Sequence, residues 1–224
     1  ALKEDEILRT LKKIGFKDND FINYRKYVNL FYTIDIVGTC NLKCPSCAWS
    51  MDEIHNMKGT MSLENFKSIT KKMVNETELI THVSFYSWGE PFLHHKLDVF
   101  INHMHELDIA VALSSNLSIK SSEQIRKVIK ASPDYLKISL SGYYPDVYNS
   151  THTGGDINLV KSNMYKLKYY IDQYKSDTFV DVNYHLYKNN IGKDLEMMEE
   201  LCNELGFALS TTYALVMPLE RVID

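Results

Sequence analysis

Three cysteines lie within eight positions of one another in the stretch IDIVGTCNLKCPSCAWS, at Cys40, Cys44 and Cys47. Three thiolates on one short loop can bind three irons of a cubane iron-sulfur cluster and leave the fourth iron open to another ligand. A structural zinc is the alternative, with His55 or Cys202 as its fourth ligand. Cys202 falls on the apolar side of a predicted helix, which favours a buried small side chain. The spacing alone leaves open both a cluster enzyme and a zinc-stabilised α/β binding module.

The cysteines need elements that position them, and six short runs rich in β-branched and aromatic residues predict strands. Stretches with helical spacing separate these runs. Because strand and helix alternate six times, the strands are predicted to be parallel and joined by right-handed crossovers. The predicted fold is α/β, an open sheet or a barrel-like curl of one. The predicted strands cover residues 32–38, 80–87, 109–115, 135–141, 179–187 and 207–216.

Capping residues mark the ends of several of the intervening helices. Ser62 is placed to N-cap one helix, and Ser121 with Gln124 has the form of a capping box. Apolar residues recur at helical spacing after Asp156, which predicts a third helix with that residue as its N-cap. The last helix is predicted to stop at Gly206. Ahead of the sheet, residues 1–30 are expected to form an N-terminal helix and an aromatic-rich connector.

Polar stretches follow four of the predicted strands. The cysteines come after the first, SWGEP (87–91) after the second, SSN (114–116) after the third and SLSG (139–142) after the fourth. In parallel α/β architectures the carboxyl ends of the strands open on a common crevice. We therefore expect these stretches to share one rim. Asn183 and His185 alternate to one side of the fifth strand and face a bound cofactor or substrate if that side is the interior.

Composition and charge restrict the class of protein. The chain has 224 residues, of which 45% are hydrophobic and 24% charged, which is typical of a globular domain. A net charge of -4 argues against nucleic-acid binding, because neutralising phosphates requires clustered Lys and Arg. No apolar run is long enough to cross a membrane, and the start ALKEDEILRTLKK lacks the apolar segment of a signal peptide. A cytoplasmic protein is expected, since clustered cysteines suit a reducing compartment.

The motifs CNLKCPSC after the first predicted strand, WGEP after the second and SLSG after the fourth resemble the radical S-adenosylmethionine (SAM) superfamily. The resemblance runs from about residue 32 to the C-terminus. It implies a partial TIM barrel of six βα units, (β/α)6. It also implies two cofactors, a 4Fe-4S cluster bound by Cys40, Cys44 and Cys47, and SAM, whose amino and carboxylate groups chelate the free iron.

The resemblance also assigns SAM contacts to residues of this chain. Gly89 and Glu90 would present backbone oxygen to the SAM amino group, and a glycine there lets the main chain approach a ligand closely. Two departures from the family pattern put the adenine contact in question: Ser46 stands where an aromatic residue is usual, and Trp88 replaces a glycine. The remaining implied contacts, to the methionyl and ribose groups and to adenine, are Ser114, Asn116, Ser139 and Ser141, with Tyr213 and Ala214 through their backbone.

The chemistry implied by the resemblance is that of the cofactor. A flavodoxin or ferredoxin supplies an electron to the cluster, SAM is cleaved to methionine and a 5'-deoxyadenosyl radical, and the radical removes a hydrogen atom from a substrate. The stretch SLSGYYPDVYNSTHTGGDI resembles members associated with carbohydrate or peptide modification, which favours epimerisation or dehydrogenation of a sugar or peptide residue. The substrate is thus expected to be a small molecule or a peptide.

Domain organisation follows from the same resemblance. Residues 31–224 are expected to be the radical SAM core, truncated after the sixth strand. Many similar members carry a further cysteine-rich domain of the SPASM or twitch kind, and this sequence has no cysteines left for one. His152 stands near a position where members carry a basic residue facing the SAM carboxylate. The four histidines at positions 94, 95, 103 and 105 are expected at the surface rather than at a metal.

Overall fold

A computed structural model describes residues 30–50, 58–77 and 79–214 of the chain. The predicted N-terminal helix and most of its connector lie outside the described residues, as does His55. The strands are β1 (Leu30–Thr33), β2 (Ile80–Ser84), β3 (Ala110–Ser115), β4 (Tyr135–Leu140), β5 (Phe179–Leu186) and β6 (Ala208–Tyr213). The helices are α3 (Leu63–Glu76), α4 (Leu97–Glu106), α5 (Ser122–Lys130), α6 (Pro145–Thr151), α7 (Ile157–Tyr174) and α8 (Lys193–Leu205), with short 3₁₀ turns η1 (Ala48–Ser50) and η2 (Pro91–Leu93).

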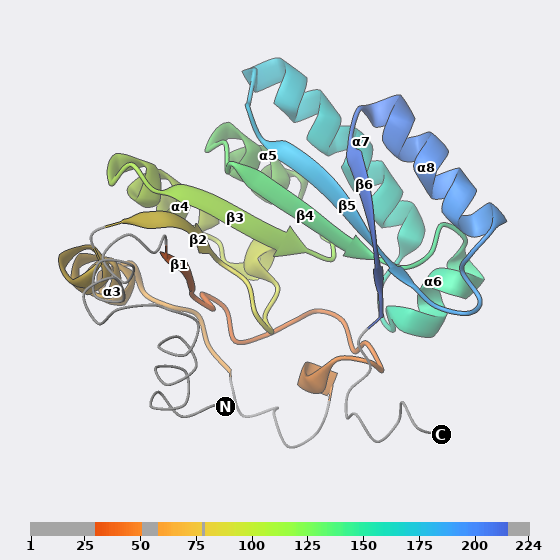
Figure 1. The fold of residues 1–224 in the computed structure, drawn as a ribbon, viewed down its shortest axis with the longest axis horizontal. Helices are drawn as coiled ribbons and strands as arrows, with labels where there is room; N and C mark the ends of the chain where they lie inside the picture. Colours follow the sequence, from red (N-terminus) through yellow and green to blue (C-terminus); the bar gives the residue numbers. More distant parts are fainter. Residues whose placement is uncertain (1–29, 51–57, 78, 215–224) are drawn as a thin grey trace, which may run out of the picture.

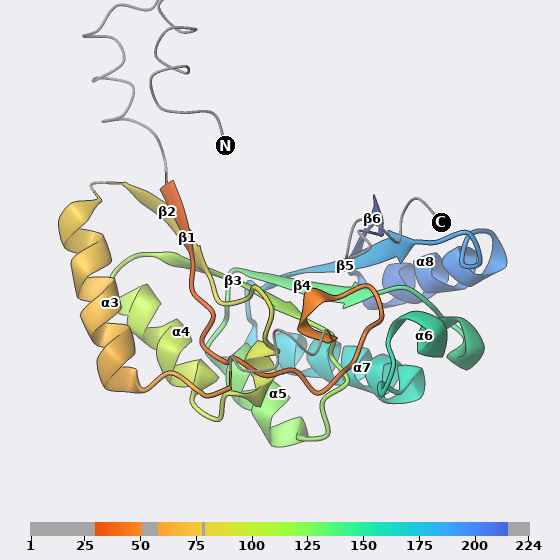
Figure 2. The same cartoon turned by 90° about the horizontal axis from the view of Figure 1, so that it is seen from below.

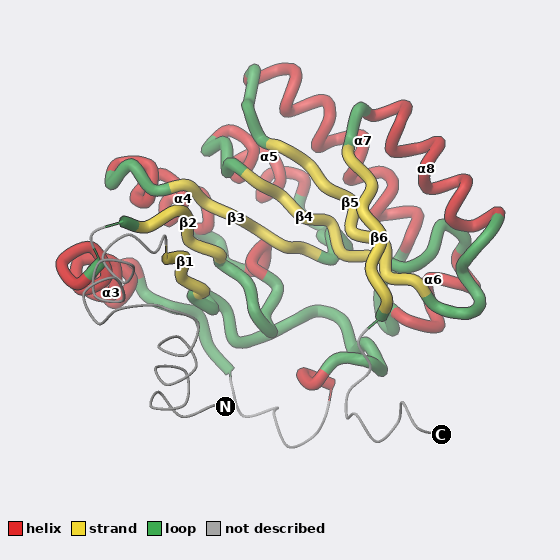
Figure 3. The backbone as a smooth tube through the Cα atoms, in the orientation of Figure 1, coloured by secondary structure: helices red, strands yellow, loops and turns green. Residues whose placement is uncertain are grey.

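The strands form one parallel sheet in the order β1-β2-β3-β4-β5-β6, so each strand pairs with its neighbours in sequence (Figure 1). Helices α3, α4, α5, α7 and α8 lie along one face of this sheet (Figure 2). The strands stay side by side while the sheet curves (Figure 3). This arrangement is a partial TIM barrel of βα units, with the helices outside, and it confirms the predicted α/β fold.

Alternation along the strands places the core between sheet and helices. On β4, Leu136, Ile138 and Leu140 are completely buried and face the helices, whereas the residues between them are partly exposed on the other face. Beneath β2 and β3, the rings of Phe66 and Phe100 stack at 4.4 Å between centroids. This packing fixes the strands from outside, so the site at their carboxyl ends stands on a rigid support.

The first strand differs from the prediction. It ends at Thr33, whereas 32–38 was expected, because residues 36–38 pair with residues 59–61 instead of with β2. Ile34 N still donates to Ser84 O at 2.8 Å, and Val37 then forms an antiparallel bridge with Thr60. The segment remains extended and apolar, which is why its sequence suggests a longer strand. At the other edge, β6 ends at Tyr213, and the predicted residues 215 and 216 lie outside the described residues.

The predicted caps are confirmed with one exception. Ser62 Oγ accepts from Asn65 N at 3.1 Å, Asp156 Oδ1 accepts from Asn158 N at 2.9 Å, and Gly206 ends α8 in the left-handed conformation. The capping box at Ser121 forms only in half. Its hydroxyl accepts from Gln124 N, but the Gln124 side chain is buried and donates to His94 O at 2.8 Å. Tertiary contact has drawn the glutamine away from its local role.

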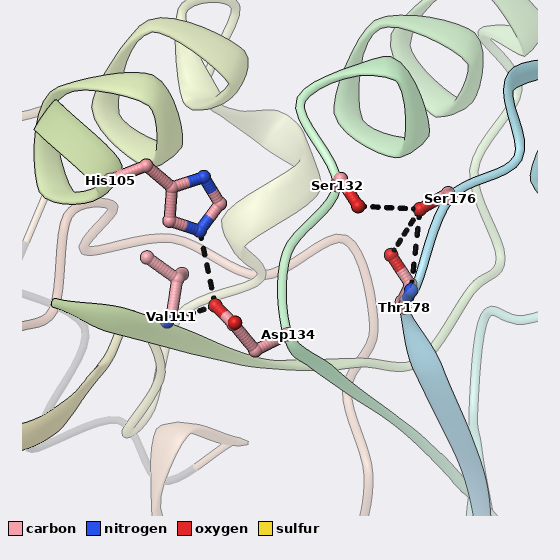
Figure 4. A network of polar contacts seen from close by, with 6 residues as sticks. All are labelled: His105, Val111, Ser132, Asp134, Ser176 and Thr178. Carbon is pink, nitrogen blue, oxygen red and sulfur yellow. Dashed lines mark hydrogen bonds and ion pairs between the residues drawn. The ribbon is translucent and has the colours of Figure 1, made fainter. Parts of the chain in front are cut away.

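Side-chain bridges tie the loops at the amino ends of the strands (Figure 4). Asp134 Oδ2 accepts from Val111 N at 2.7 Å and from His105 Nε2 at 3.0 Å. Nearby, the hydroxyls of Ser132 and Ser176 lie 2.8 Å apart. In barrels this end supports stability while chemistry gathers at the other end. None of the described helices is long and apolar enough to span a lipid bilayer.

Candidate active site

The cysteine loop follows β1 and lies across the carboxyl ends of the strands, where backbone hydrogen bonds hold it. Lys43 N donates to Thr153 O and Glu90 N donates to Thr39 O, both at 2.9 Å. Leu42, between the first two cysteines, is almost completely buried and anchors the loop in the core. The loop is therefore fastened both to the turn after β2 and to the turn after α6.

All three cysteines line one pocket of about 450 Å³, a volume within the range of small-molecule sites. Of the residues predicted to contact SAM, Asn116, Ser139, Tyr213 and Ala214 line the same pocket. Gly89, Glu90, Ser114 and Ser141 are not among its lining residues. Further residues of the cysteine loop and of β6 and residues from three other segments complete the pocket: Leu42, Ser46, Ser87, Trp88, Thr151, His152, His185, Tyr187 and Thr212.

The thiols sit in a desolvated, negatively biased place. Burial raises the pKa of Cys40 to about 11 and that of Cys44 to about 12, and neighbouring cysteines add to both shifts. Acting against this, Leu42 N and Asn116 Nδ2 donate to Cys40 Sγ at 3.5 and 3.6 Å. Thiolates confined in this way require a cationic partner, which is what an iron-sulfur cluster supplies.

The donor set suits a cluster better than a single ion. Cys202 is buried on α8 and is not among the lining residues of the pocket, so the structure does not bring it to the other three thiols. Among the described residues, no three His, Cys, Asp or Glu side chains are grouped so as to hold one metal ion. A cubane makes a different demand, because each of its three cysteines binds a separate iron.

A buried hydroxyl beside the loop lacks a partner among the described residues. Tyr148 has no exposed surface, and its Oη makes no hydrogen bond within that part of the chain. A Cβ on Gly155 would lie 2.7 Å from that oxygen, so only glycine fits there. Burial raises the pKa of Tyr148, and among its charged neighbours Cys44 contributes most. An orphaned donor next to the cysteine loop is a feature expected where sulfur ligands of a cluster accept hydrogen bonds.

Asn116, at the end of β3, joins the cysteine loop to the sheet. Its Nδ2 donates to Asn41 Oδ1 at 3.0 Å as well as to Cys40, and its Oδ1 accepts from Ser118 N at 2.9 Å. Its backbone N donates to Glu90 Oε2 at 2.8 Å. Every polar group of this side chain is engaged, so its position at the pocket wall is fixed.

The buried carboxylate of Glu90 links the loop after β2 to the end of β3. Its carboxylate accepts from Phe92 N, Ser115 Oγ and Asn116 N at 2.8 to 3.1 Å. Burial raises the pKa of Glu90 to about 7, against the effect of these donors. Gly89 allows the main chain beside Glu90 to pass close to the main chain of Val37, because a Cβ on Gly89 would lie 1.7 Å from Val37 O.

Three serines near the ends of β3 and β4 lie at or beside the pocket, together with the histidine that follows α6. Ser114 Oγ and Ser139 Oγ lie 3.3 Å apart. Ser141 is fully buried, and its hydroxyl contacts Thr151 Oγ1 and, at 3.1 Å, His152 Nδ1. Burial lowers the pKa of His152 to about 4, so this ring is neutral at physiological pH. Its ring stacks on Tyr148 at 4.7 Å.

Sequence reasoning missed two residues of the site. Tyr187, just after β5, lines the pocket and donates its hydroxyl to Ser46 Oγ at 3.1 Å, beside the last cysteine. Asp35 accepts from the backbone N of Ser87, Trp88 and Gly89 at 3.0 to 3.4 Å. These contacts join residues more than fifty positions apart, so no local sequence pattern predicts them.

The four histidines were expected at the surface, which is wrong for His94. Its side chain is buried, Nε2 bonds Met61 O at 2.9 Å, and Nδ1 accepts from Lys96 N at 3.2 Å. His94 therefore supports the turn after β2. His103 and His105 contact Thr70 and Asp134 respectively, and neither lines the pocket.

A curved parallel sheet with a thiol-lined pocket at its carboxyl edge defines the class of protein, a partial barrel with an iron-sulfur type site. A family model described as the radical SAM superfamily matches residues 34–204 of the chain. Because this match covers most of the sequence, the chain belongs to that superfamily, whose enzymes use SAM and a 4Fe-4S cluster. The expected family and cofactors are thereby confirmed.

Solved structures show the same fold. Streptococcus suis SuiB bound to its precursor peptide SuiA matches with a TM-score of 0.64 and 14% identity, covering 96% of this chain and 46% of SuiB. AdoMet-bound anSMEcpe matches with a TM-score of 0.60 and 18% identity, covering 83% of this chain and 51% of that one. The chain thus spans about half the length of these structures. A search of curated proteins found no match.

Proposed function

We propose that this chain is the catalytic core of an enzyme that cleaves SAM reductively at a 4Fe-4S cluster and abstracts a hydrogen atom from a bound substrate. The observation that carries the proposal is one pocket lined by the three thiols together with Asn116 and Ser139. When bound, the cluster supplies the electron that divides SAM into methionine and a 5'-deoxyadenosyl radical. The chain itself must bind, orient and shield these groups.

In this proposal Cys40, Cys44 and Cys47 hold the cluster. The burial of the first two thiols disfavours free thiolates and so favours their ligation to iron. Leu42 N and Asn116 Nδ2 donate to Cys40 Sγ. Hydrogen bonds to ligand sulfur stabilise the reduced, more negative state.

SAM would occupy the rest of the pocket. Ser87 and Trp88 line it, and the loop they form leads into Gly89 and Glu90, whose backbone oxygens we assign to the SAM amino group. Ser139 and Asn116 reach the pocket directly, and Ser114 contributes through its contact with Ser139. Ser141 acts on the same region by orienting His152, since its hydroxyl is engaged there.

Tyr187 is the aromatic residue that we assign to adenine, together with the backbone of Tyr213 and Ala214. All three line the pocket at the end of β5 and β6. The Tyr187 hydroxyl donates to Ser46, the residue before the last cysteine, and this contact supports assigning to Tyr187 the aromatic role that the family usually gives to the residue at that position. The departure at Ser46 is thus compensated from another strand.

The reaction outcome and partners are proposed from family resemblance. We propose epimerisation or dehydrogenation of a sugar or peptide residue, with a flavodoxin or ferredoxin as electron donor in the cytoplasm. SuiB, one of the similar structures, is bound to a precursor peptide. Because this chain spans only about half of those structures, we also propose that residues 31–224 are a core to which substrate-covering parts are added.

Metal analysis of protein purified and reconstituted without oxygen tests the proposal. We expect about four irons and as many sulfides per chain, with the broad visible absorbance of a cluster. Alanine at Cys40, Cys44 or Cys47 should abolish that absorbance. Cys202→Ala is the matched control and should retain full iron, because that thiol is buried on α8. One zinc per chain without iron would instead support the zinc-stabilised binding module and contradict the enzyme.

A further inference from the structure

A groove of about 550 Å³ adjoins the cysteine loop outside the cofactor pocket. Residues of the cysteine loop, of η2 and the segment after it, and of the segment between β3 and α5 line this groove, among them Asn41, Phe92, Leu93, His95, Ile119 and Lys120. None of the residues that line the groove also lines the pocket that contains the cysteines. The groove is therefore a separate site beside the same loop.

Asn41 connects this groove to the first cysteine. It follows Cys40 in the chain, and its Oδ1 lies 4.0 Å from Cys40 Sγ. Its Nδ2 donates to the main-chain oxygen of Ser118 at 2.9 Å, and Ser118 also lines the groove. Asn116 Nδ2 donates both to Cys40 Sγ and to Asn41 Oδ1. A single, firmly held side chain thus extends from the groove to a sulfur that we assign to the cluster.

The lining of the groove combines apolar surface with positive charge. Phe92 and Ile119 are buried there, whereas Leu93 is 40% exposed. Lys120 is exposed, and Lys96, also exposed, follows a histidine that lines the groove. No described Asp or Glu is among the lining residues, and within the described part of the chain neither lysine takes part in an ion pair. The groove is therefore complementary to a partner that carries negative charge around an apolar contact.

The position of the groove favours an electron-transfer protein over a substrate. A substrate must reach the reactive carbon in the cofactor pocket, and the groove shares no lining residue with that pocket. An electron donor needs only to come close to a ligand of the cluster, and Asn41 provides that approach. Redox proteins meet through small, transient interfaces that opposite charges steer. A concave apolar lining also admits the edge of a planar ring such as a flavin.

We propose that this groove is the docking site of the electron donor, and that the donor is an acidic flavoprotein of the flavodoxin class whose flavin edge enters the groove beside Asn41. This inference rests on the proposed function. One electron passes from the anionic flavin hydroquinone, which becomes the neutral semiquinone, to the cluster held by Cys40 and the two other cysteines. No bond is formed or broken, and no proton is transferred in this step.

Binding of a purified, oxidised flavodoxin to the reconstituted chain, measured by isothermal titration calorimetry, tests the inference without turnover. Lys120→Glu reverses a charge at the groove, and Leu93→Asp places a charge on its exposed apolar part. We expect each variant to raise the Kd for flavodoxin at least about fivefold. Binding to the wild type should weaken as the salt concentration rises. Lys130→Glu is the matched control, because this exposed lysine is the last residue of α5 and does not line the groove; its Kd should equal that of the wild type.

Stopped-flow absorbance then measures reduction of the cluster by two reductants. With flavodoxin hydroquinone below saturation, Lys120→Glu should be reduced at least about fivefold more slowly than the wild type. With dithionite the two rates should be equal, because a small reductant needs no docking surface.

Three results would overturn the inference. They are a wild type that neither binds flavodoxin nor is reduced by it, a Lys120→Glu variant that binds flavodoxin as tightly as the wild type, and a variant that dithionite also reduces fivefold more slowly. Reduction by a ferredoxin but not by flavodoxin belongs with the first of these, since it contradicts the flavin partner. Failure of the proposed function is distinguishable, because it would appear with dithionite as a missing cluster or as uncleaved SAM. A protein that cleaves SAM with dithionite but does not bind flavodoxin contradicts only the docking site.

Discussion

At the residue scale, the hydroxyl of Tyr148 is a single group that we expect to affect the midpoint potential of the bound cluster. It is buried without a partner beside the cysteine loop, and Cys44 is its foremost charged neighbour. By contrast, the equally buried hydroxyl of Tyr184 is satisfied, since it donates to Asp194 and to Asn190 O. The two tyrosines therefore allow one hydroxyl to be compared with another of like burial.

Replacing Tyr148 by Phe should lower the midpoint potential of the bound cluster, because a nearby O–H donor favours the reduced state. Redox titration followed by electron paramagnetic resonance measures the shift. In the cluster-free protein the same variant should leave the free energy of unfolding nearly unchanged, since the lost hydroxyl has no partner among the described residues. Tyr184→Phe should do the opposite, destabilising by about 1–3 kcal/mol without moving the potential. An unaltered potential in Tyr148→Phe would contradict this assignment.

At the scale of elements, the loop between β2 and η2 is held in place by Asp35, which lies in the segment that follows β1. Asp35 Oδ1 accepts from Ser87 N and Gly89 N, and Oδ2 accepts from Trp88 N. This carboxylate is a positioning residue, because it acts on SAM only through the loop that lines the pocket. Its removal should change cofactor affinity more than the fold.

We expect Asp35→Asn to raise the KM for SAM about tenfold. The asparagine amide nitrogen would replace one carboxylate oxygen that accepts from a backbone N–H of the loop, so two donors would face each other and the loop would shift. The kcat at saturating SAM should fall less, and the cluster content should stay at the wild-type level. Steady-state kinetics and iron analysis measure the three quantities. Asp172→Asn serves as the exposed carboxylate control. If KM is unchanged while kcat alone falls, the positioning role is wrong.

Local patterns predicted the elements well because their causes are local. Ser62 and Asp156 cap helices through atoms two or three residues away, and alternation on β4 is visible in the sequence. The hydrogen bond from Asn116 N to Glu90 and the one from Tyr187 to Ser46 join separate segments, in the second case across 141 positions. No spacing rule reaches that far. The polar face of β4 was open to prediction from alternation, since Tyr135, Lys137 and Ser139 repeat every second residue.

At the scale of the whole molecule, a sheet covered by helices on one face supports a pocket, and the residues that line this pocket come from the carboxyl ends of all six strands. In the described chain, Cys40, Asn116, Tyr187 and Ala214 line that pocket from four different segments. The chain spans only about half of the solved structures it resembles. We propose that this core binds the cofactors and cleaves SAM, and that substrate turnover also requires parts beyond it.

The central claim is that this pocket cleaves SAM by one-electron reduction. The most direct measurement is mass spectrometry of 5'-deoxyadenosine formed by anaerobically reconstituted protein with SAM and dithionite. We predict that the wild type forms the nucleoside and that Cys44→Ala forms none, with Cys202→Ala matching the wild type. A wild type that carries a full cluster yet forms no 5'-deoxyadenosine, or a Cys44→Ala variant that forms as much, would contradict the account.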